Sequence, residues 1–229
     1  MVNLRVSNSD KDWHPKLFWF FAGLFVTAYL LSVILTAKVF TFHGIVLTAG
    51  IFVFPIVCIL GDVLTEIYGF NNARKVIWLG FIANIFLIAL TQLAIVLPAA
   101  LDPNIDTAFV NLFSLTPRIV VASLTAYLVG EFMNSYVVSK MKIRQEGKNF
   151  GLRAILSTVV GQFFDTIIVV IIAFYGVLPN SDLLKLAISS WIIKVLYEVI
   201  VLPLTILTVR YVKNKEGVEH YDKEEISLI

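Results

Sequence analysis

Long apolar runs alternate with short polar segments along most of the chain. Six of these runs are long enough, at about 20 residues, to cross roughly 30 Å of hydrocarbon as an α-helix. The first run is too long for the apolar region of a signal peptide and has no small-x-small cleavage site, so we expect it to be retained. The pattern therefore predicts an all-α, polytopic integral membrane protein, a bundle of six transmembrane helices. The predicted spans are Leu17–Ala37, Gly44–Glu66, Val76–Leu97, Arg118–Ser139, Leu152–Leu178 and Leu183–Val209.

Composition agrees with this prediction. Hydrophobic residues make up 59% of the 229 residues and charged residues 15%, whereas a soluble domain carries about 25% charged residues. The single cysteine, Cys58, lies inside an apolar run, so no internal disulfide can form. The net charge of +2 gives no indication of a nucleic acid partner, because the basic residues lie at the ends of the spans.

The distribution of basic residues predicts the orientation in the bilayer. Lysine and arginine accumulate in cytoplasmic segments, and here fourteen lie on one side of the predicted membrane and three on the other. Both termini are therefore predicted to be cytoplasmic. We expect a cytoplasmic segment at 1–16, a six-helix transporter domain at 17–209 and a cytoplasmic tail at 210–229. The side with fourteen holds Arg5, Lys11, Lys16, Arg74, Lys75, Lys140, Lys142, Arg144, Lys148, Arg153, Arg210, Lys213, Lys215 and Lys223.

Ionisable side chains occur inside the spans, where each costs about 2.5–3.5 kcal/mol at mid-bilayer and therefore faces a protein interior or water. Residues three and four apart share one face of a helix, and this spacing groups the charged residues with other polar ones. We estimate depth from the helical rise per residue, counted from the nearest basic residue on the cytoplasmic side. On this estimate three of the stripes lie about 13–24 Å into the membrane. The four stripes are Asp62, Thr65 and Glu66; Tyr127, Glu131, Asn134 and Ser135; Thr158, Gln162, Asp165 and Thr166; and Ser190, Trp191, Lys194, Tyr197 and Glu198.

The spans hold five acidic residues and one lysine, which leaves four negative charges without a partner inside the membrane. Buried carboxylates without a partner either take up protons or bind a group rich in hydrogen-bond donors. We therefore expect a polar chamber near mid-membrane, as in transporters, and a cargo that carries N–H donors or positive charge. Protonatable acids would also permit coupling to protons.

Structural roles are the alternative for most of these residues. Lys194 and Glu198 are four residues apart and could neutralise each other. Asp62 and Glu66 lie near the end of a span and could reach water by snorkelling. The aromatic side chains could serve packing alone, and Asn84 and Gln92 on the third span could simply join helices by hydrogen bonds.

An enzyme is not indicated. All three histidines, His14, His43 and His220, fall outside the spans, so none could act there as a base or a ligand. Gly61 and Asp62 are not part of the G-x-G-D motif of an aspartyl intramembrane protease. No group of residues has the spacing of a metal site, and no cofactor is expected.

Three segments resemble one known family. These are FPIVCILGDVLTEIYGFNNARKVI, YLVGEFMNSYVVSKMK and LRAILSTVVGQFFDTIIVVIIAFYG, which contain D-x-x-T-E-x-Y-G and S-T-x-x-G-Q-x-x-D-T. They resemble the queuosine precursor transporter family, which is vitamin uptake transporter-like. The resemblance implies a six-helix, multi-pass carrier of the inner (plasma) membrane that imports 7-deazaguanine bases such as preQ0 or preQ1, or queuine, for tRNA modification. It covers nearly the whole chain except the first sixteen residues and the tail.

The chemistry of such a base matches the acidic spans. A 7-deazaguanine presents N1–H and an exocyclic amino group side by side, which one carboxylate accepts as a pair. We expect Asp165 or Glu131 to bind this edge, with Gln162 and Asn134 assisting. Lys194 is a further candidate donor to the carbonyl oxygen, and Glu198 adds to the surplus of acids.

Two further groups complete the predicted site. The flat ring is expected to stack on aromatic side chains of the last two spans. The stripe on the second span is expected to form an inner gate or a proton relay. The predicted aromatic residues are Phe163, Phe164, Trp191 and Tyr197, and the predicted gate residues are Asp62, Thr65 and Glu66.

Two other functions compete with a solitary carrier. The first is the substrate-binding subunit of an energy-coupling-factor vitamin importer, which docks through alanines four residues apart on its first helix. Ala22, Ala28 and Ala37 do not have that spacing, which favours a solitary carrier. The second is a structural or assembly membrane protein that binds no small molecule. The possibility of a homo-oligomer is left open, and the lipid bilayer is the one certain partner.

Overall fold

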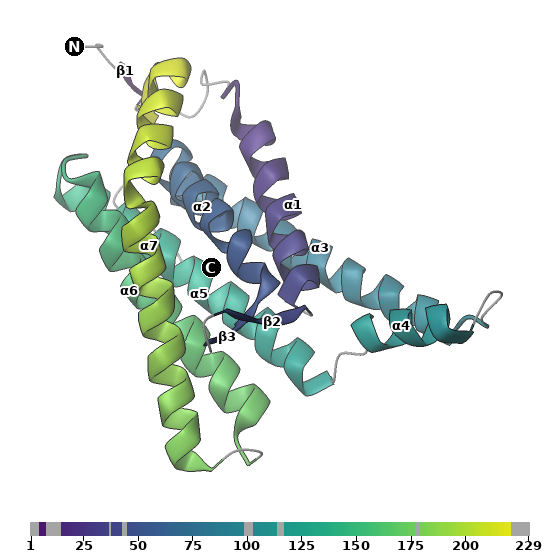
Figure 1. Cartoon of the computed structure of the whole chain (residues 1–229). Coiled ribbons are helices and arrows are strands. Elements are labelled where there is room, and N and C mark those ends of the chain that lie inside the picture. The colour runs from purple at the N-terminus through teal and green to yellow at the C-terminus, as the bar shows by residue number, and fades with distance from the viewer. Residues whose placement is uncertain are drawn as a thin grey trace.

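The computed structural model describes residues 5–7, 15–36, 38–42, 45–98, 103–113, 117–176 and 179–220. These residues form seven α-helices and four short strands (Figure 1). Large apolar side chains cover the outside of the helices, including Trp19, Leu90 and Ile200. Such an exterior suits lipid rather than water, as expected for a multi-pass membrane protein. The helices are α1 (Phe18–Thr36), α2 (Phe54–Tyr68), α3 (Phe70–Val96), α4 (Pro103–Phe113), α5 (Pro117–Arg144), α6 (Phe150–Val169) and α7 (Asn180–Glu216).

Helix α2 is the centre of the bundle. It packs against α1, α3, α5 and α7, and every residue from Ile59 to Tyr68 is buried. The helix ends at Gly69, whose φ of 79° lies in a region that glycine enters without steric cost. This single residue joins α2 to α3, which explains the glycine of the motif D-x-x-T-E-x-Y-G.

The prediction of one continuous second span from Gly44 was wrong. Strands β2 (Val39–Phe42) and β3 (Ile45–Thr48) pair in antiparallel fashion, and a short 3-10 helix (Ala49–Phe52) follows before α2 begins. The segments VFTF and IVLT consist of β-branched and other large apolar residues, a composition that favours strands. Pro55 in the first turn of α2 then favours helix initiation there.

Four helical segments are long and apolar enough to cross a membrane: Phe18–Leu35, Phe70–Val96, Phe150–Phe174 and Leu183–Glu216. They correspond to the first, third, fifth and sixth predicted spans. A fifth crossing arises if α4 and α5, which meet at an angle of 46°, count as one bent span. The 15 residues of α2 reach about 22 Å, which is less than the hydrocarbon thickness. Among the described residues, the structure thus gives four or five spans and not the predicted six.

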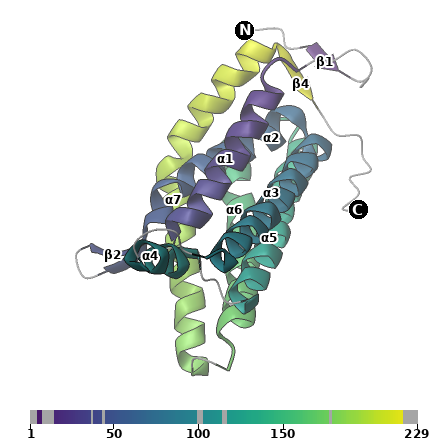
Figure 2. The same ribbon diagram turned by 90° about the vertical axis from the view of Figure 1, so that its right-hand side faces the viewer.

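The first and last strands of the described chain lie side by side. Strand β1 (Arg5–Ser7) pairs in parallel with β4 (Val218–His220), beyond the ends of α1 and α7 (Figure 2). Helix α7 continues seven residues beyond the predicted end of the last span and stops at Gly217, which has a positive φ of 68°. Its last turn is therefore available for contacts with the first helices of the bundle.

Candidate functional site

Three carboxylates from three helices lie close together inside the bundle. Asp62 comes from α2, Glu131 from α5 and Glu198 from α7, and Asp62 interacts electrostatically with both of the others. Asp62 and Glu198 are almost fully buried. None of the three forms an ion pair with a basic side chain among the described residues. We call Asp62, Glu131 and Glu198 the acidic centre.

The hydrogen bonds of the acidic centre are incomplete. Asn134 of α5 lies near the Asp62 carboxylate, and Cys58 of α2 lies near Glu198. Buried polar atoms without a described hydrogen-bond partner are costly, so a cluster of them points to a site that binds something. Six such atoms belong to residues of the predicted stripes: Asp62 Oδ2, Glu66 Oε2, Asn134 Oδ1, Gln162 Oε1, Thr166 Oγ1 and Glu198 Oε1.

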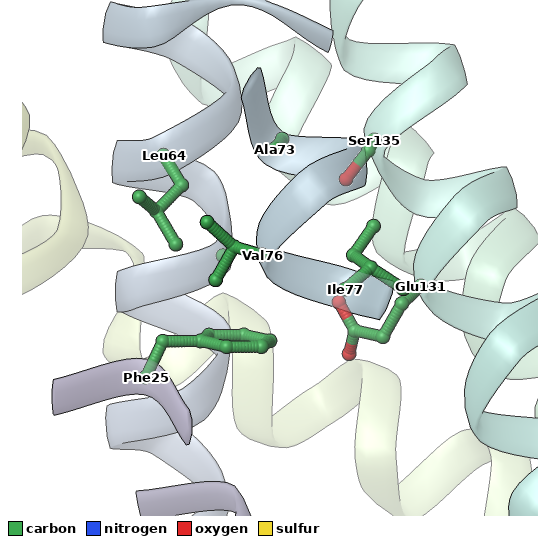
Figure 3. A pocket seen from close by; sticks show the side chains of 8 residues that line it. Phe25, Leu64, Ala73, Val76, Ile77, Glu131 and Ser135 are labelled. Atoms are coloured by element: carbon green, nitrogen blue, oxygen red, sulfur yellow. The ribbon is translucent and has the colours of Figure 1, made fainter. Parts of the chain in front are cut away.

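Glu131 borders a small cavity between α1, α2, α3 and α5. Its carboxylate and the ring of Phe25 both line this space, as Figure 3 shows. A methyl group placed on Gly61 would lie 3.6 Å from Glu131 Oε2 and 3.6 Å from the Phe25 ring, so the glycine brings α2 close to the carboxylate. The cavity measures about 10 Å³, which is room for about one water molecule.

Two facing glycines bring the polar stripes of α5 and α6 together. A Cβ on Gly130 would lie 2.9 Å from the Cβ of Asp165, and a Cβ on Gly161 would lie 2.9 Å from the Cβ of Asn134. Small residues allow helix backbones to approach closely in membranes. Gly130 thus places Asp165 of α6 beside Glu131, and Gly161 places Asn134 of α5 beside Gln162. This is the structural role of the glycines in GEFMNS and GQFFDT.

Asp165 is paired, unlike the acidic centre. Lys194 of α7 donates to Asp165 Oδ2, and the two side chains are 32% and 21% exposed. The expected alternative of a Lys194–Glu198 pair is therefore wrong, because the lysine bridges α7 to α6 instead. The pair ties the two helices together at the edge of the chamber.

Glu66 is also paired and is completely buried. Its Oε1 accepts from Arg153 at 2.7 Å and from Lys213 at 2.9 Å, and Lys142 donates to its backbone carbonyl oxygen. We call Glu66, Arg153 and Lys213 the paired cluster. The expected count of four acids without partners thus falls to three, because cations from beyond the spans fold back onto Glu66. Snorkelling of Asp62 and Glu66 to water is excluded by their burial.

A second cluster joins three helix ends next to the paired cluster. The carboxylate of Glu216, at the end of α7, accepts from the backbone N–H groups of Lys16 and Leu17 and from the Tyr68 hydroxyl. The end of α7 therefore holds the start of α1 and the end of α2. On α2 itself, Thr65 donates to the carbonyl of Gly61 and is hydrogen-bonded to Ser135 of α5.

Two of the predicted aromatic residues, Phe163 and Phe164, are exposed on α6. Phe163 is 45% exposed and makes an edge-to-face contact with Trp191, whose indole N–H donates to the carbonyl of Val159. Tyr197 of α7 is partly buried and contacts Phe54 of α2 edge to face. Phe163 and Trp191 therefore lie at the α6–α7 contact, and Tyr197 lies at the α2–α7 contact.

Sequence reasoning missed an aromatic pair inside the bundle. Tyr29 of α1 and Tyr127 of α5 stack with ring centroids 4.0 Å apart, and Asn84 of α3 donates to the Tyr29 hydroxyl. Asn84 thus joins helices, as its structural alternative proposed. The spacing of Tyr127 and Glu131, one helical turn apart, was the available signal for this pair.

The chain matches known transporters along most of its length. The model of a family described as putative vitamin uptake transporter matches residues 48–208. A probable queuosine precursor transporter of Bacillus subtilis (strain 168) is 32% identical over 187 residues, which cover 81% of this chain and 80% of that protein. A queuosine precursor transporter of Escherichia coli (strain K12) is 26% identical over 198 residues, covering 84% of this chain and 85% of that protein.

No solved structure matches the chain significantly. These relatives give no support to the alternative of an energy-coupling-factor subunit, and they point to a transporter rather than an enzyme. The cluster of polar side chains between apolar helices agrees with their printed names. The chain therefore belongs to the queuosine precursor transporter family.

Proposed function

We propose that this protein imports queuosine precursors, 7-deazaguanine bases such as preQ0, preQ1 or queuine, across the inner membrane into the cytoplasm. The observation that carries the proposal is the acidic centre: three carboxylates inside the bundle, of which Asp62 and Glu198 are buried, with no described cation and beside amide groups with unused hydrogen-bonding atoms. Such a site favours a guest with several N–H donors or an amine. The names of the two relatives supply the class of compound.

Glu131 is the residue we assign to the guanine edge. Its carboxylate lines a cavity and has no described cationic partner, so both oxygens can accept N1–H and the amino group. Asn134 and Gln162 lie beside it across the glycine contact of α5 and α6. Asp165 is the weaker candidate for the guanine edge in this structure, because its carboxylate accepts a hydrogen bond from Lys194. An amine-bearing precursor would be held by the remaining acids, Asp62 and Glu198.

Binding must widen the site. A cavity for one water molecule cannot hold a bicyclic base, so the structure corresponds to a closed form of the proposed transporter. Substrate entry requires that α1 and α2 move relative to α5. A two-state movement of this kind is how carriers expose one site to either side of the membrane.

The stripe of Asp62, Thr65 and Glu66 forms the inner gate in this proposal. Glu66 would hold that end shut through its two cationic partners, and Asp62, one turn deeper, would be the protonatable member. The pairing of β1 with β4 at this end of the bundle and the excess of basic residues there support a cytoplasmic location for the gate.

The test of the function is restoration of queuosine-modified tRNA. Cells that cannot make the precursors and lack their own uptake system would be supplied with preQ0, preQ1 or queuine, with and without this protein. We expect modification at low external precursor only when the protein is present. Absence of modification with each of the three compounds, despite protein in the membrane, would falsify the proposal.

A variant links this function to the chamber. Asp165→Asn should abolish uptake while the protein still inserts, because it removes the partner of Lys194 at the edge of the site. Asp106→Asn, on α4 outside the chamber, is the matched control and should transport normally. Normal uptake by the Asp165 variant would remove that residue from the site.

A further inference from the structure

The side of the acidic centre that faces α1 holds a second polar group. Tyr29 and Tyr127 are both buried, with their rings 22° from parallel, and Asn84 beside them is almost fully buried. No base can enter between rings whose centroids are 4.0 Å apart. A ligand can therefore contact this pair only at the edge of the rings, where the hydroxyl groups lie.

The two tyrosine hydroxyl groups differ in the hydrogen-bonding capacity that remains unused. Tyr127 donates its proton to the backbone carbonyl of Ile77 at 3.1 Å. Tyr29 instead accepts from Asn84 Nδ2 at 3.0 Å, and no described residue accepts the Tyr29 proton. A tyrosine hydroxyl can both donate and accept, so Tyr29 retains an unused donor in the interior. Asn84 Oδ1 is also without a described partner.

The tyrosine pair lies next to Glu131, because Tyr127 is one turn before Glu131 on the same face of α5 and Tyr29 stacks on Tyr127. Tyr29 interacts electrostatically with Glu131 and with Asp165, and Tyr127 interacts with Glu131. Phe25, one turn before Tyr29 on the same face of α1, lines the cavity that Glu131 borders. The cavity, the carboxylate and the hydroxyl thus belong to one region between α1, α3 and α5.

We propose that Tyr29 recognises the carbonyl oxygen of the substrate and thereby determines its specificity. The inference rests on the proposed function and deepens it. On a 7-deazaguanine the carbonyl oxygen is next to N1–H on the same edge, so a base held by Glu131 presents its carbonyl to a neighbouring donor. Asn84 is a positioning residue, because its amide fixes the Tyr29 hydroxyl.

This assignment replaces Lys194 as the donor to the carbonyl. The lysine is engaged with Asp165 on the other side of the acidic centre, and its side chain is partly exposed. The Tyr29 hydroxyl is neutral and does not have to leave a charged partner to bind the substrate. A neutral donor beside a carboxylate completes a donor–acceptor pattern that adenine-type bases do not match.

The test compares two ligands on the purified full-length protein in detergent. The first is 7-deazaguanine, and the second is its 6-thio analogue, which keeps N1–H and the amino group but replaces the carbonyl oxygen with a poor acceptor. We expect the wild type to bind the oxo compound about tenfold more tightly, the equivalent of one hydrogen bond. Tyr29→Phe should lower the affinity for the oxo compound about tenfold and leave that for the thio compound unchanged.

Two further variants test whether the effect is specific to the Tyr29 hydroxyl. Asn84→Leu should reduce the oxo-to-thio ratio without touching the ligand, which a general loss of folding would not do. Tyr211→Phe removes a hydroxyl from an exposed tyrosine of α7 and should leave the ratio at the wild-type value. Thermal unfolding of each variant reports whether it is folded.

The outcomes separate this inference from the proposed function. If the wild type binds neither compound, the proposed function itself fails. If the wild type binds both and Tyr29→Phe keeps the full preference for the oxo compound, Tyr29 has no role and the transport function stands. Loss of the preference in Tyr29→Phe and in Asn84→Leu, but not in Tyr211→Phe, supports the assignment.

Discussion

Asp62 and Glu66 lie one turn apart on the same face of α2, and the protein treats them in opposite ways. Glu66 is held by Arg153 and Lys213, whereas Asp62 has no described cationic partner and two acidic neighbours. Both carboxylates are buried to the same degree. Burial therefore does not distinguish these two acids, and the presence of two cationic partners on Glu66 does.

The difference extends to the regions around them. The paired cluster and Glu216 join α1, α2, α6 and α7 by contacts that satisfy most of the charges involved. The acidic centre joins α2, α5 and α7 and leaves acceptor atoms unused. The paired cluster also has two atoms without a described partner, Glu66 Oε2 and Arg153 Nε, but its carboxylate is held by two cations, whereas the acidic centre has no described cation. The comparison predicts that changes in the two regions affect different properties.

The largest effect is expected from Glu66→Gln. The change leaves the buried Arg153 without its carboxylate, and breaking a buried ion pair from one side costs about 3–5 kcal/mol. We expect a strong loss of folded protein and a lower unfolding temperature in detergent. The control is Glu146→Gln, which removes the exposed partner of Lys148 and should change neither. A Glu66→Gln protein with normal yield and unfolding temperature would show that the paired cluster is dispensable.

Glu131→Gln should give the converse result. The amide replaces one acceptor oxygen with a donor, so it opposes the N–H groups of the proposed substrate, and uptake should fall about a hundredfold. Stability should change little or rise, because the variant removes one of three mutually repelling charges. Uptake of labelled precursor and thermal unfolding of the same preparation check the two parts. A variant that loses stability and uptake together would place Glu131 among the structural acids.

Helical spacing sets the limit on how much of these two regions can be predicted from the sequence. Spacing of three and four residues groups Glu131 with Asn134 and Gln162 with Asp165, and the structure brings both pairs to one contact. Spacing gives no information on partners from other helices. Arg153 and Lys213 were expected at the cytoplasmic flank, and nothing in their own neighbourhoods showed that they would fold back onto Glu66.

The number of spans shows a second limit. Apolar residues continue from Gly44 to Glu66, and hydropathy cannot tell a strand followed by a short helix from one long helix. The short α2 is possible because other helices surround it, so its length need not match the bilayer. The aromatic residues show a third limit. Phe163 and Trp191 share a region of sequence with polar residues, yet Phe163 points away from the acids, while Tyr29 comes from a run with no charge to mark it.

Gly161→Ala tests the contact that assembles the acidic side of the chamber. The added methyl group would lie 2.9 Å from the Asn134 Cβ and 2.9 Å from the Gly130 carbonyl oxygen, so α5 and α6 must separate. Overpacking costs about 1–3 kcal/mol, of which the higher helix propensity of alanine returns up to about 1. We expect a moderately lower unfolding temperature together with reduced uptake. Gly23→Ala, where the methyl group meets nothing within 4 Å, is the control and should be neutral or stabilising; equal behaviour of the two variants would contradict the close contact.

The smallest effect is expected from Tyr68→Phe, at the end of α2. The change removes one hydrogen bond of 2.8 Å to Glu216, but the Glu216 carboxylate keeps the backbone N–H groups of Leu17 and Lys16. Because no acceptor is left without a donor, the cost should be about 1 kcal/mol. Tyr175→Phe, which removes an exposed hydroxyl, gives the baseline for thermal unfolding. Uptake per folded molecule should stay within about twofold of the wild type, since a loss of one bond among several leaves the end of the bundle closed. A loss of several kcal/mol would mean that the Tyr68 hydroxyl supports more than Glu216, and would weaken the distinction between an end held by ion pairs and a centre without a described cation.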